Sequence, residues 1–151
     1  MTEMNMRNMT NLLPRLLSCL LAATLSISMS VAWAQSDDPV ENPRVLMKTT
    51  DGDITIELFA DKSPITVENF LRYVDDGHYD GTVFHRVISN FMIQGGGFDT
   101  ELKEKPTRDP IVNESKNKLH NTRGTLAMAR TSDPDSAAAQ FFINQRSNQI
   151  G

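Results

Sequence analysis

The sequence predicts one domain of mainly β structure, and three features indicate this class. Several short runs are rich in β-branched and aromatic residues or alternate apolar with polar ones, as strands do. Glycine, proline, asparagine and aspartate separate these runs. Only residues 64–76 carry apolar side chains at helical spacing. A chain of 151 residues with this pattern predicts a barrel or sandwich with one early helix.

The first 34 residues differ from the rest. Residues 16–31 contain no charge, follow Arg7 and Arg15, and precede Ala32-Trp33-Ala34. A positive start, a short apolar core and a small-x-small exit are typical of a secretory signal peptide, cleaved here after Ala34. The alternative is a membrane anchor, but the run is shorter than the roughly 20 apolar residues that a spanning helix needs. We therefore expect export to the periplasm.

The exported chain would comprise residues 35–151, with a polar lead-in at 35–44 and one domain at 45–151. It would lose Cys19, the only cysteine, and so could form no disulfide. It would keep 18 acidic and 13 basic residues, a net charge of −5. An acidic domain without a basic run argues against a nucleic-acid partner.

The domain opens with a predicted hairpin followed by a helix. Asp51-Gly52 separates residues 45–50 from residues 53–59, and Asp-Gly between two such runs is a strong hairpin signal. Ser63 then provides a helix cap, with Pro64 at the first helical position and Gly77 at the exit. The expected buried faces contain Ile54, Ile56 and Leu58 of the strand and Val67, Phe70, Leu71 and Val74 of the helix.

Four more strands are predicted downstream. Residues 82–94 read as two strands broken at Ser89-Asn90, and residues 99–123 read as a long polar surface loop. Residues 125–129 and 140–144 read as the last two strands.

Several kinds of catalytic site find no support in the pattern. His78, His85 and His120 lie on different predicted elements and lack the spacing of metal ligands. His85 is more simply a structural histidine. Residues 35–151 contain no cysteine nucleophile, and no serine stands in a G-x-S-x-G turn.

A different combination of residues indicates a ligand pocket. Arg86 lies within an apolar strand, and Phe91 and Met92 precede Gln94. The predicted strand at 140–144 repeats this combination of an amide and aromatic side chains at residues 140–142. Alternation places Phe84, Arg86 and Ile88 on one face, and Gln140 and Phe142 on one face. An apolar pocket beside a cation and amides suits a small apolar ligand with a backbone attached. The alternatives are that Phe91 and Met92 are core, that Arg86 is a surface ion-pair partner, and that the glutamines satisfy strand ends.

The motifs in which these residues stand resemble the signature blocks of the cyclophilin family. The blocks are VFHRVISNFMIQGGGF, NTRGTLAMAR and AAAQFFIN, and the opening TTDGDITIELFADKSPITVENFLRYV is similar to the family's first hairpin and helix. The similarity runs from about Val45 to Asn144, and the long loop and MAR ending most resemble the bacterial exported branch. The resemblance implies a closed antiparallel β-barrel with capping helices, and isomerisation of the bond that precedes proline.

The resemblance also implies roles for individual residues. Matched position by position, the catalytic pair is Arg86 and Gln94, and the substrate-binding set is Phe91, Met92, Ala129, Arg130, Gln140 and Phe142. No cofactor or metal is implied. The implied partners are proline-containing segments of exported proteins, bound by a monomer without nucleic acid and, after signal cleavage, without a membrane.

These residue types fit the chemistry. Amide resonance makes an X–Pro bond resist rotation with a barrier of about 18–20 kcal/mol. No covalent bond breaks during rotation, so a nucleophile is not needed. In the twisted transition state the prolyl nitrogen regains a lone pair, to which the guanidinium of Arg86 can donate a hydrogen bond.

The resemblance also implies that the chain stops before the family's last strands and closing helix. The family continues after Asn144 with an aromatic-Leu-Asp segment, and Ile150 stands where an aromatic pocket wall falls. Two rivals to an enzyme therefore remain at the level of sequence, namely a proline-peptide binding module without useful catalysis and a non-functional fragment.

Overall fold

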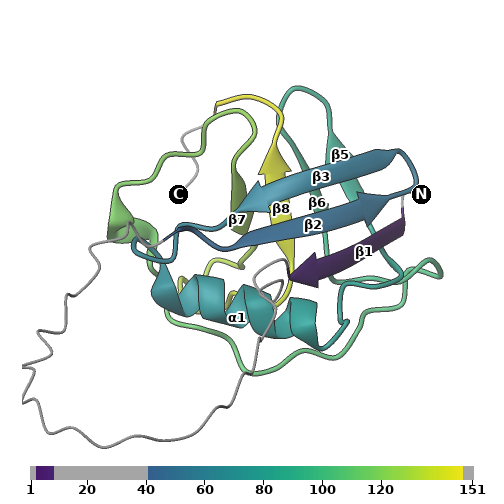
Figure 1. Cartoon of the computed structure of the whole chain (residues 1–151), viewed down its shortest axis with the longest axis horizontal. Coiled ribbons are helices and arrows are strands. Elements are labelled where there is room, and N and C mark those ends of the chain that lie inside the picture. The colour runs from purple at the N-terminus through teal and green to yellow at the C-terminus, as the bar shows by residue number, and fades with distance from the viewer. Residues whose placement is uncertain (1–2, 9–40, 148–151) are drawn as a thin grey trace, which may run out of the picture.

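The computed structural model describes residues 3–8 and 41–147, and its strands form two antiparallel sheets (Figure 1). The first sheet contains β1 (Glu3–Asn8), β2 (Arg44–Thr49), β3 (Gly52–Glu57) and β4 (Thr82–Val83), in the order β3-β2-β1-β4. The second contains β5 (Arg86–Ile88), β6 (Met92–Gly95), β7 (Leu126–Met128) and β8 (Phe141–Asn144), in the order β5-β6-β8-β7. The helices are α1 (Pro64–Asp75) and the 3₁₀ turn η1 (Ser115–Asn117). The predicted mainly β class is confirmed.

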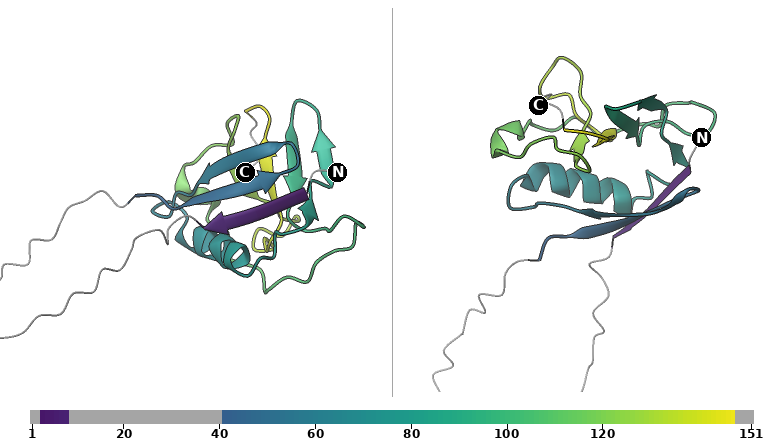
Figure 2. Two further views of the ribbon diagram at one scale, coloured as in Figure 1. Left: turned by 45° about the vertical axis from the view of Figure 1, so that its right-hand side comes forward. Right: turned by 90° about the horizontal axis from the view of Figure 1, so that it is seen from above.

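The two sheets are stacked across one another, and α1 runs along one side of both (Figures 1 and 2). They are linked through β4, because the Val83 amide donates to the Phe98 carbonyl at 2.9 Å, just beyond β6. Closure into a continuous barrel stays a prediction. Neither helix in the described ranges is long and apolar enough to cross a membrane.

The predicted hairpin is confirmed in place, and the structure gives its register. β2 and β3 pair from Arg44 opposite Glu57 to Thr49 opposite Gly52. Gly52 has a φ of 128°, a conformation that L side chains rarely adopt, which explains the Asp-Gly turn. On the predicted buried face Ile56 is buried, whereas Ile54 is 36% exposed.

The helix bounds and the place of Ser63 as the N-cap residue agree with the prediction, but the expected capping hydrogen bond is absent. Val67, Phe70 and Val74 are buried and Leu71 is half-buried. The Ser63 side chain makes no capping hydrogen bond. Its hydroxyl instead accepts a hydrogen bond from Asn117 at 2.7 Å, and the first helical amides are capped from elsewhere in the chain.

Residues 82–94 form three strands rather than the two predicted. The break at Ser89-Asn90 is confirmed, and Asn90 has a φ of 60°. A further break falls at residues 84–85, because the chain crosses there from the first sheet to the second. Phe84 therefore lies outside β5, and its ring packs edge-on against Phe141 instead of sharing a strand face with Arg86.

The core is centred on an aromatic cluster where α1 meets both sheets. Phe70, Tyr79 and Phe141 have ring centroids 5.2 to 5.9 Å apart, and each ring is almost fully buried. The Tyr79 hydroxyl donates to the Ala139 carbonyl at 2.8 Å, which satisfies its polar atom inside the core. Burial raises the pKa of this phenol well above its ordinary value.

The N-terminal strand was not predicted, because residues 1–34 were assigned to a signal peptide. β1 pairs with both β2 and β4, and its Met4 and Met6 side chains are buried. The apolar run 16–31, Cys19 and the cleavage site after Ala34 lie outside the described residues, as does Ile150. Signal cleavage therefore stays a prediction.

Candidate functional site

The second sheet places three of the sequence-derived positions, together with Ala127, in one lateral row. Arg86 on β5 lies opposite Gln94 on β6, Gln94 lies opposite Phe142 on β8, and Phe142 lies opposite Ala127 on β7. Residues directly opposite in antiparallel strands project from the same face. The predicted catalytic pair and one wall of the predicted proline pocket therefore share that face.

A chain of side-chain hydrogen bonds orients this row. Arg86 Nη1 donates to Gln94 Oε1 at 3.2 Å, and Gln94 Nε2 donates to Gln140 Oε1 at 2.9 Å. Gln140 Nε2 lies 3.5 Å from Glu104 Oε1 at the end of the chain. Because the amide nitrogen of Gln94 is directed to Gln140, its oxygen is left to face the guanidinium. Gln94 is thus a positioning residue for Arg86.

The Arg86 guanidinium is directed toward the amide of Gln94 and not toward a carboxylate. Arg86 is exposed, and none of the ion pairs among residues 3–8 and 41–147 includes it. The reading of Arg86 as a surface ion-pair partner is therefore not supported. An amide neighbour holds the guanidinium in place while leaving its positive charge uncompensated.

Apolar side chains adjoin this cation. Met92 is 3% exposed, whereas Phe91 and Phe142 are half-buried. Two backbone hydrogen bonds hold Phe91, from its amide to the Ile88 carbonyl at 3.1 Å and from the Gln145 amide to its own carbonyl at 2.9 Å. All three apolar residues line a cavity, so Met92 belongs both to the core and to the cavity wall.

The cavity has a volume of about 920 Å³ and extends from the second sheet toward β3 and α1. It is within the range of small-ligand pockets in proteins. The sequence-derived site residues that line it are Arg86, Phe91, Met92, Gln94, Ala129, Arg130 and Phe142. Gln140 is the exception. It does not line the cavity, and its contact with the site is the hydrogen bond that it accepts from Gln94.

Ala129 and Arg130, which the family resemblance assigns to substrate binding, directly follow β7. The Ala129 amide donates to the Gln140 carbonyl at 2.8 Å, so this amide is already used inside the fold. A peptide can then pair with Ala129 only through its carbonyl. The Arg130 side chain is exposed and donates to the Thr131 carbonyl at 3.0 Å, which turns it along the loop.

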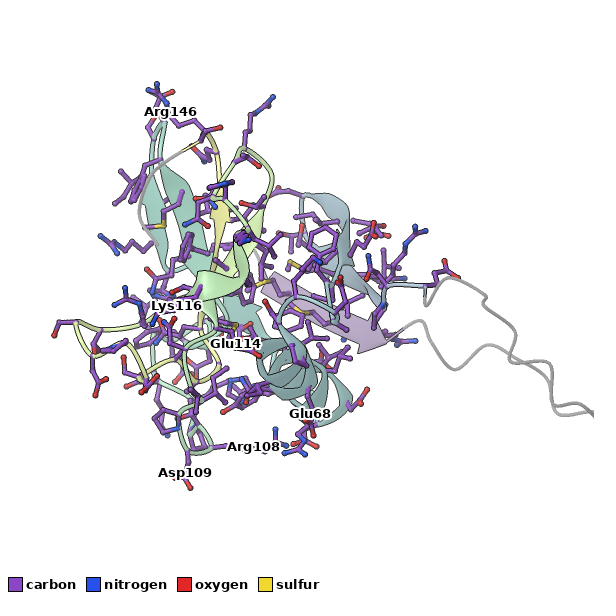
Figure 3. The ribbon with its side chains drawn as sticks, turned by 90° about the vertical axis from the view of Figure 1, so that its left-hand side faces the viewer. Glu68, Arg108, Asp109, Glu114, Lys116 and Arg146 are labelled. Carbon is purple, nitrogen blue, oxygen red and sulfur yellow. The ribbon has the colours of Figure 1, made fainter. Side chains whose placement is uncertain are left out.

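Sequence reasoning missed three residues that support the site. Glu104 lies at the end of the hydrogen-bond chain. Gly97 leaves room for the Gln140 side chain, since a Cβ at residue 97 would lie 2.4 Å from Gln140 Cγ. The third is Glu114 beside η1, which lies against α1 in Figure 3. Its carboxylate accepts hydrogen bonds from the amides of Ile65 and Thr66 at 3.2 and 2.8 Å. Gly97 stands out in the sequence as part of the run Gly95-Gly96-Gly97, but no local pattern marks the two acids.

His78 and His85 have structural contacts. The His85 ring packs at a tilt against Phe98 with ring centroids 4.5 Å apart, and a ring nitrogen of His78 lies 3.2 Å from the Gly96 carbonyl oxygen. Burial lowers the pKa of each imidazole below its ordinary value of 6.5. Within residues 3–8 and 41–147, no three metal-ligating side chains lie close enough to hold an ion.

Comparison with known proteins identifies the family. The profile described as "Cyclophilin type peptidyl-prolyl cis-trans isomerase/CLD" matches residues 44–150. A peptidyl-prolyl cis-trans isomerase of Acinetobacter baylyi is 63% identical over 109 residues, covering 72% of this chain and 58% of that protein. Peptidyl-prolyl cis-trans isomerase B of Escherichia coli is 60% identical over 106 residues, covering 70% and 65%. The chain belongs to the cyclophilin-type peptidyl-prolyl cis-trans isomerase family.

Solved structures agree with this fold. The cyclophilin AquaCyp293 from Hirschia baltica superposes with a TM-score of 0.62 at 27% identity, over 70% of this chain and 58% of that one. A cyclophilin-type isomerase of Cryptosporidium parvum, crystallised in the presence of the dipeptide Ala-Pro, gives 0.59 at 32% identity, over 70% and 69%. The chain spans about three fifths of the length of the first curated relatives it matches.

Proposed function

We propose that this chain accelerates cis/trans rotation of X–Pro bonds in polypeptides. The observation that carries the proposal is the Arg86 guanidinium, which an amide holds beside an apolar cavity. Relatives at 60% and 63% identity are named peptidyl-prolyl cis-trans isomerases, and a structural neighbour was crystallised with Ala-Pro. Both comparisons support this reaction.

The proposed mechanism uses the cavity wall to hold the proline and Arg86 to stabilise the twisted bond. Phe91, Met92 and Phe142 provide apolar surface for the pyrrolidine ring. While the ring is held, the preceding residue rotates about the C–N bond. Loss of resonance restores the lone pair on the prolyl nitrogen, and Arg86 donates a hydrogen bond to it. This bond is strong only at the twisted geometry, so it lowers the barrier without trapping either isomer.

Gln94 and Gln140 serve the same step by orienting the guanidinium. A free arginine side chain samples many rotamers, and fixing it before rotation avoids that entropic cost in the transition state. Every group in the proposed step is a protein side chain, and no cofactor takes part.

We further propose that the substrates are proline-containing segments of exported proteins, and that the chain acts in the periplasm as a monomer. The charge-free run at 16–31 with its Ala32-Trp33-Ala34 exit supports export. Fractionation of cells that produce the full chain tests this proposal. Recovery in the cytoplasmic fraction alone would contradict it.

The isomerase proposal is tested by the catalysed rate on a short X–Pro peptide. The full chain is compared with Arg86→Ala and with Arg72→Ala, which removes the same charge from a helix position that does not line the cavity. We expect acceleration by the parent and by Arg72→Ala, and loss of roughly a hundredfold in kcat/KM for Arg86→Ala. Peptide binding without acceleration by the parent would instead identify a proline-peptide binding module.

A further inference from the structure

The charges around the cavity are unequal. Its described lining contains three arginines and two glutamates, and no aspartate or lysine. The arginines are Arg86, Arg123 and Arg130, and the glutamates are Glu57 and Glu114. The whole chain, in contrast, has 19 acidic and 15 basic residues and a net charge of −4. An acidic chain therefore has a cavity whose lining carries an excess of positive charge.

Both glutamates already have partners within the fold. Glu114 accepts hydrogen bonds from two amides in the first turn of α1, where the helix dipole is positive. Glu57 accepts a hydrogen bond from Asn42 at 2.8 Å and lies 4.0 Å from the Arg44 guanidinium. In the part of the chain that the structure describes, neither carboxylate forms an ion pair with an arginine of the cavity.

The three cavity arginines keep their positive charge. All three residues are exposed, and none takes part in an ion pair among the described residues. Arg86 donates to the amide oxygen of Gln94, and Arg130 donates to the Thr131 carbonyl at 3.0 Å. Both acceptors are neutral, so they orient a guanidinium without cancelling its charge.

The loop after β7 holds Arg130 in place. Thr131, whose carbonyl accepts from Arg130, donates to the Ser136 hydroxyl oxygen from its own amide at 2.9 Å and its hydroxyl at 2.8 Å. The acids of this loop, Asp133 and Asp135, each accept a hydrogen bond from a backbone amide, at 3.0 and 2.8 Å. The Thr131 carbonyl uses one of the five donors of the guanidinium, which leaves donors for a carboxylate.

Arg123 and Arg130 lie beyond the two ends of β7, which is the last strand in the order of the second sheet. In the middle of β7, Ala127 lies opposite Phe142, one wall of the proposed proline pocket. An extended peptide advances about 3.3 Å per residue, as a strand does. Residues a few positions from a proline bound at Phe142 are therefore within reach of an arginine.

We propose that the cavity selects proline-containing segments in which acidic side chains flank the proline, and that Arg130 and Arg123 determine this preference. The inference rests on the proposed isomerase function, because it names the substrates of that same site. Each arginine pairs with one carboxylate of the bound segment. The summed field of the three arginines also raises the local concentration of acidic segments at the cavity.

Three short X–Pro peptides test the preference with the full chain. They carry two glutamates, two glutamines or two lysines, one on each side of the proline and two residues from it. We expect kcat/KM about five- to tenfold higher for the glutamate peptide than for the glutamine peptide, and lower again for the lysine peptide. In 1 M salt the ratio should approach one, because the Debye length falls to about 3 Å. Equal kcat/KM for all three peptides would overturn the preference and leave the isomerase function intact.

Dissociation constants of the same peptides, from titrations followed by nuclear magnetic resonance, separate this inference from the isomerase proposal. The glutamate peptide should bind about five- to tenfold more tightly than the glutamine peptide. That result without acceleration of any peptide would overturn the isomerase function alone. Equal dissociation constants, or no binding of any peptide, would overturn the charge preference.

Substitutions of single arginines identify the residues responsible. Arg130→Gln and Arg123→Gln should each reduce the preference for the glutamate peptide by about threefold. Arg130→Glu should shift the preference toward the lysine peptide, which loss of a purely structural contact would not do. The matched control is Arg72→Gln, which removes the same charge from α1 outside the cavity and should leave the preference unchanged. A preference that neither cavity variant reduces, or that Arg72→Gln reduces equally, would overturn the assignment.

Discussion

Replacing Glu114 by alanine should destabilise the domain, although this residue lies in a loop far in sequence from the helix that it caps. Its carboxylate accepts hydrogen bonds from the Ile65 amide at 3.2 Å, the Thr66 amide at 2.8 Å and the Thr66 hydroxyl at 2.7 Å. Loss of an N-terminal cap costs about 0.5–2 kcal/mol, and loss of a negative charge at the positive end of a helix costs about 0.3–1 kcal/mol more. Because the carboxylate is half-buried, we expect a loss of about 2 kcal/mol.

Urea unfolding followed by circular dichroism measures this loss. With a slope of about 2 kcal/mol per molar urea, the midpoint should fall by about 1 M. Glu114→Gln keeps one acceptor oxygen and should lose less than Glu114→Ala. The control is Glu101→Ala, an exposed acid in the same long loop, which should leave the midpoint unchanged. Equal midpoints for Glu114→Ala and Glu101→Ala would refute the capping role.

Three further predictions concern the hydrogen-bond chain and the histidines. Gln94→Leu should reduce kcat/KM by about five- to tenfold with little change in unfolding free energy, because it removes the hydrogen bond that orients the exposed Arg86 guanidinium, a contribution of about 1 kcal/mol. An unchanged kcat/KM would show that Gln94 does not position Arg86. Gly97→Ala should displace the Gln140 side chain and lower kcat/KM, and adding Gln140→Ala should lower kcat/KM no further. Additive losses would show that Gly97 and Gln140 do not act through the same hydrogen-bond chain. Acidification from about pH 7 to about pH 5 should reduce the unfolding free energy, because the folded-state pKa values of His78 and His85 lie below 6.5. Their contribution to the unfolding free energy is present above pH 6.5 and is lost as the pH falls through the folded-state pKa values. In the variant with both His78→Gln and His85→Gln, urea titrations should therefore show a weaker dependence of the unfolding free energy on pH. An identical dependence in parent and variant would show that these histidines do not cause it.

Local patterns were sufficient where structure is decided by neighbouring residues. Asp51-Gly52 predicted the hairpin because a tight turn needs a residue that tolerates positive φ, and Gly52 has a φ of 128°. Pro64 and the apolar spacing predicted α1 because its buried face packs on the core. Alternation along strands predicted which side chains share a face within one strand, whereas the family resemblance named Arg86, Gln94 and Phe142 as site residues, and their row across three strands is a finding of the structure.

The missed features depend on contacts between distant parts of the chain. Ser63 has the chemistry of a cap, but its hydroxyl is engaged by Asn117 while Glu114 reaches the helix amides. Residues 82–88 were predicted to form one strand because the apolar pattern does not show where the chain changes sheet. β1 was assigned to a leader because Met4 and Met6 become core residues only once β2 and β4 flank them.

The most direct test of the proposed catalysis separates peptide binding from bond rotation. Exchange spectroscopy by nuclear magnetic resonance on an X–Pro peptide gives both the dissociation constant and the cis-to-trans rate of the bound peptide. For Arg86→Ala we expect little change in binding, since Phe91, Met92 and Phe142 still line the cavity, and a bound-state rate lower by roughly a hundredfold. A variant that binds as the parent does and rotates the bond equally fast would contradict the role of Arg86.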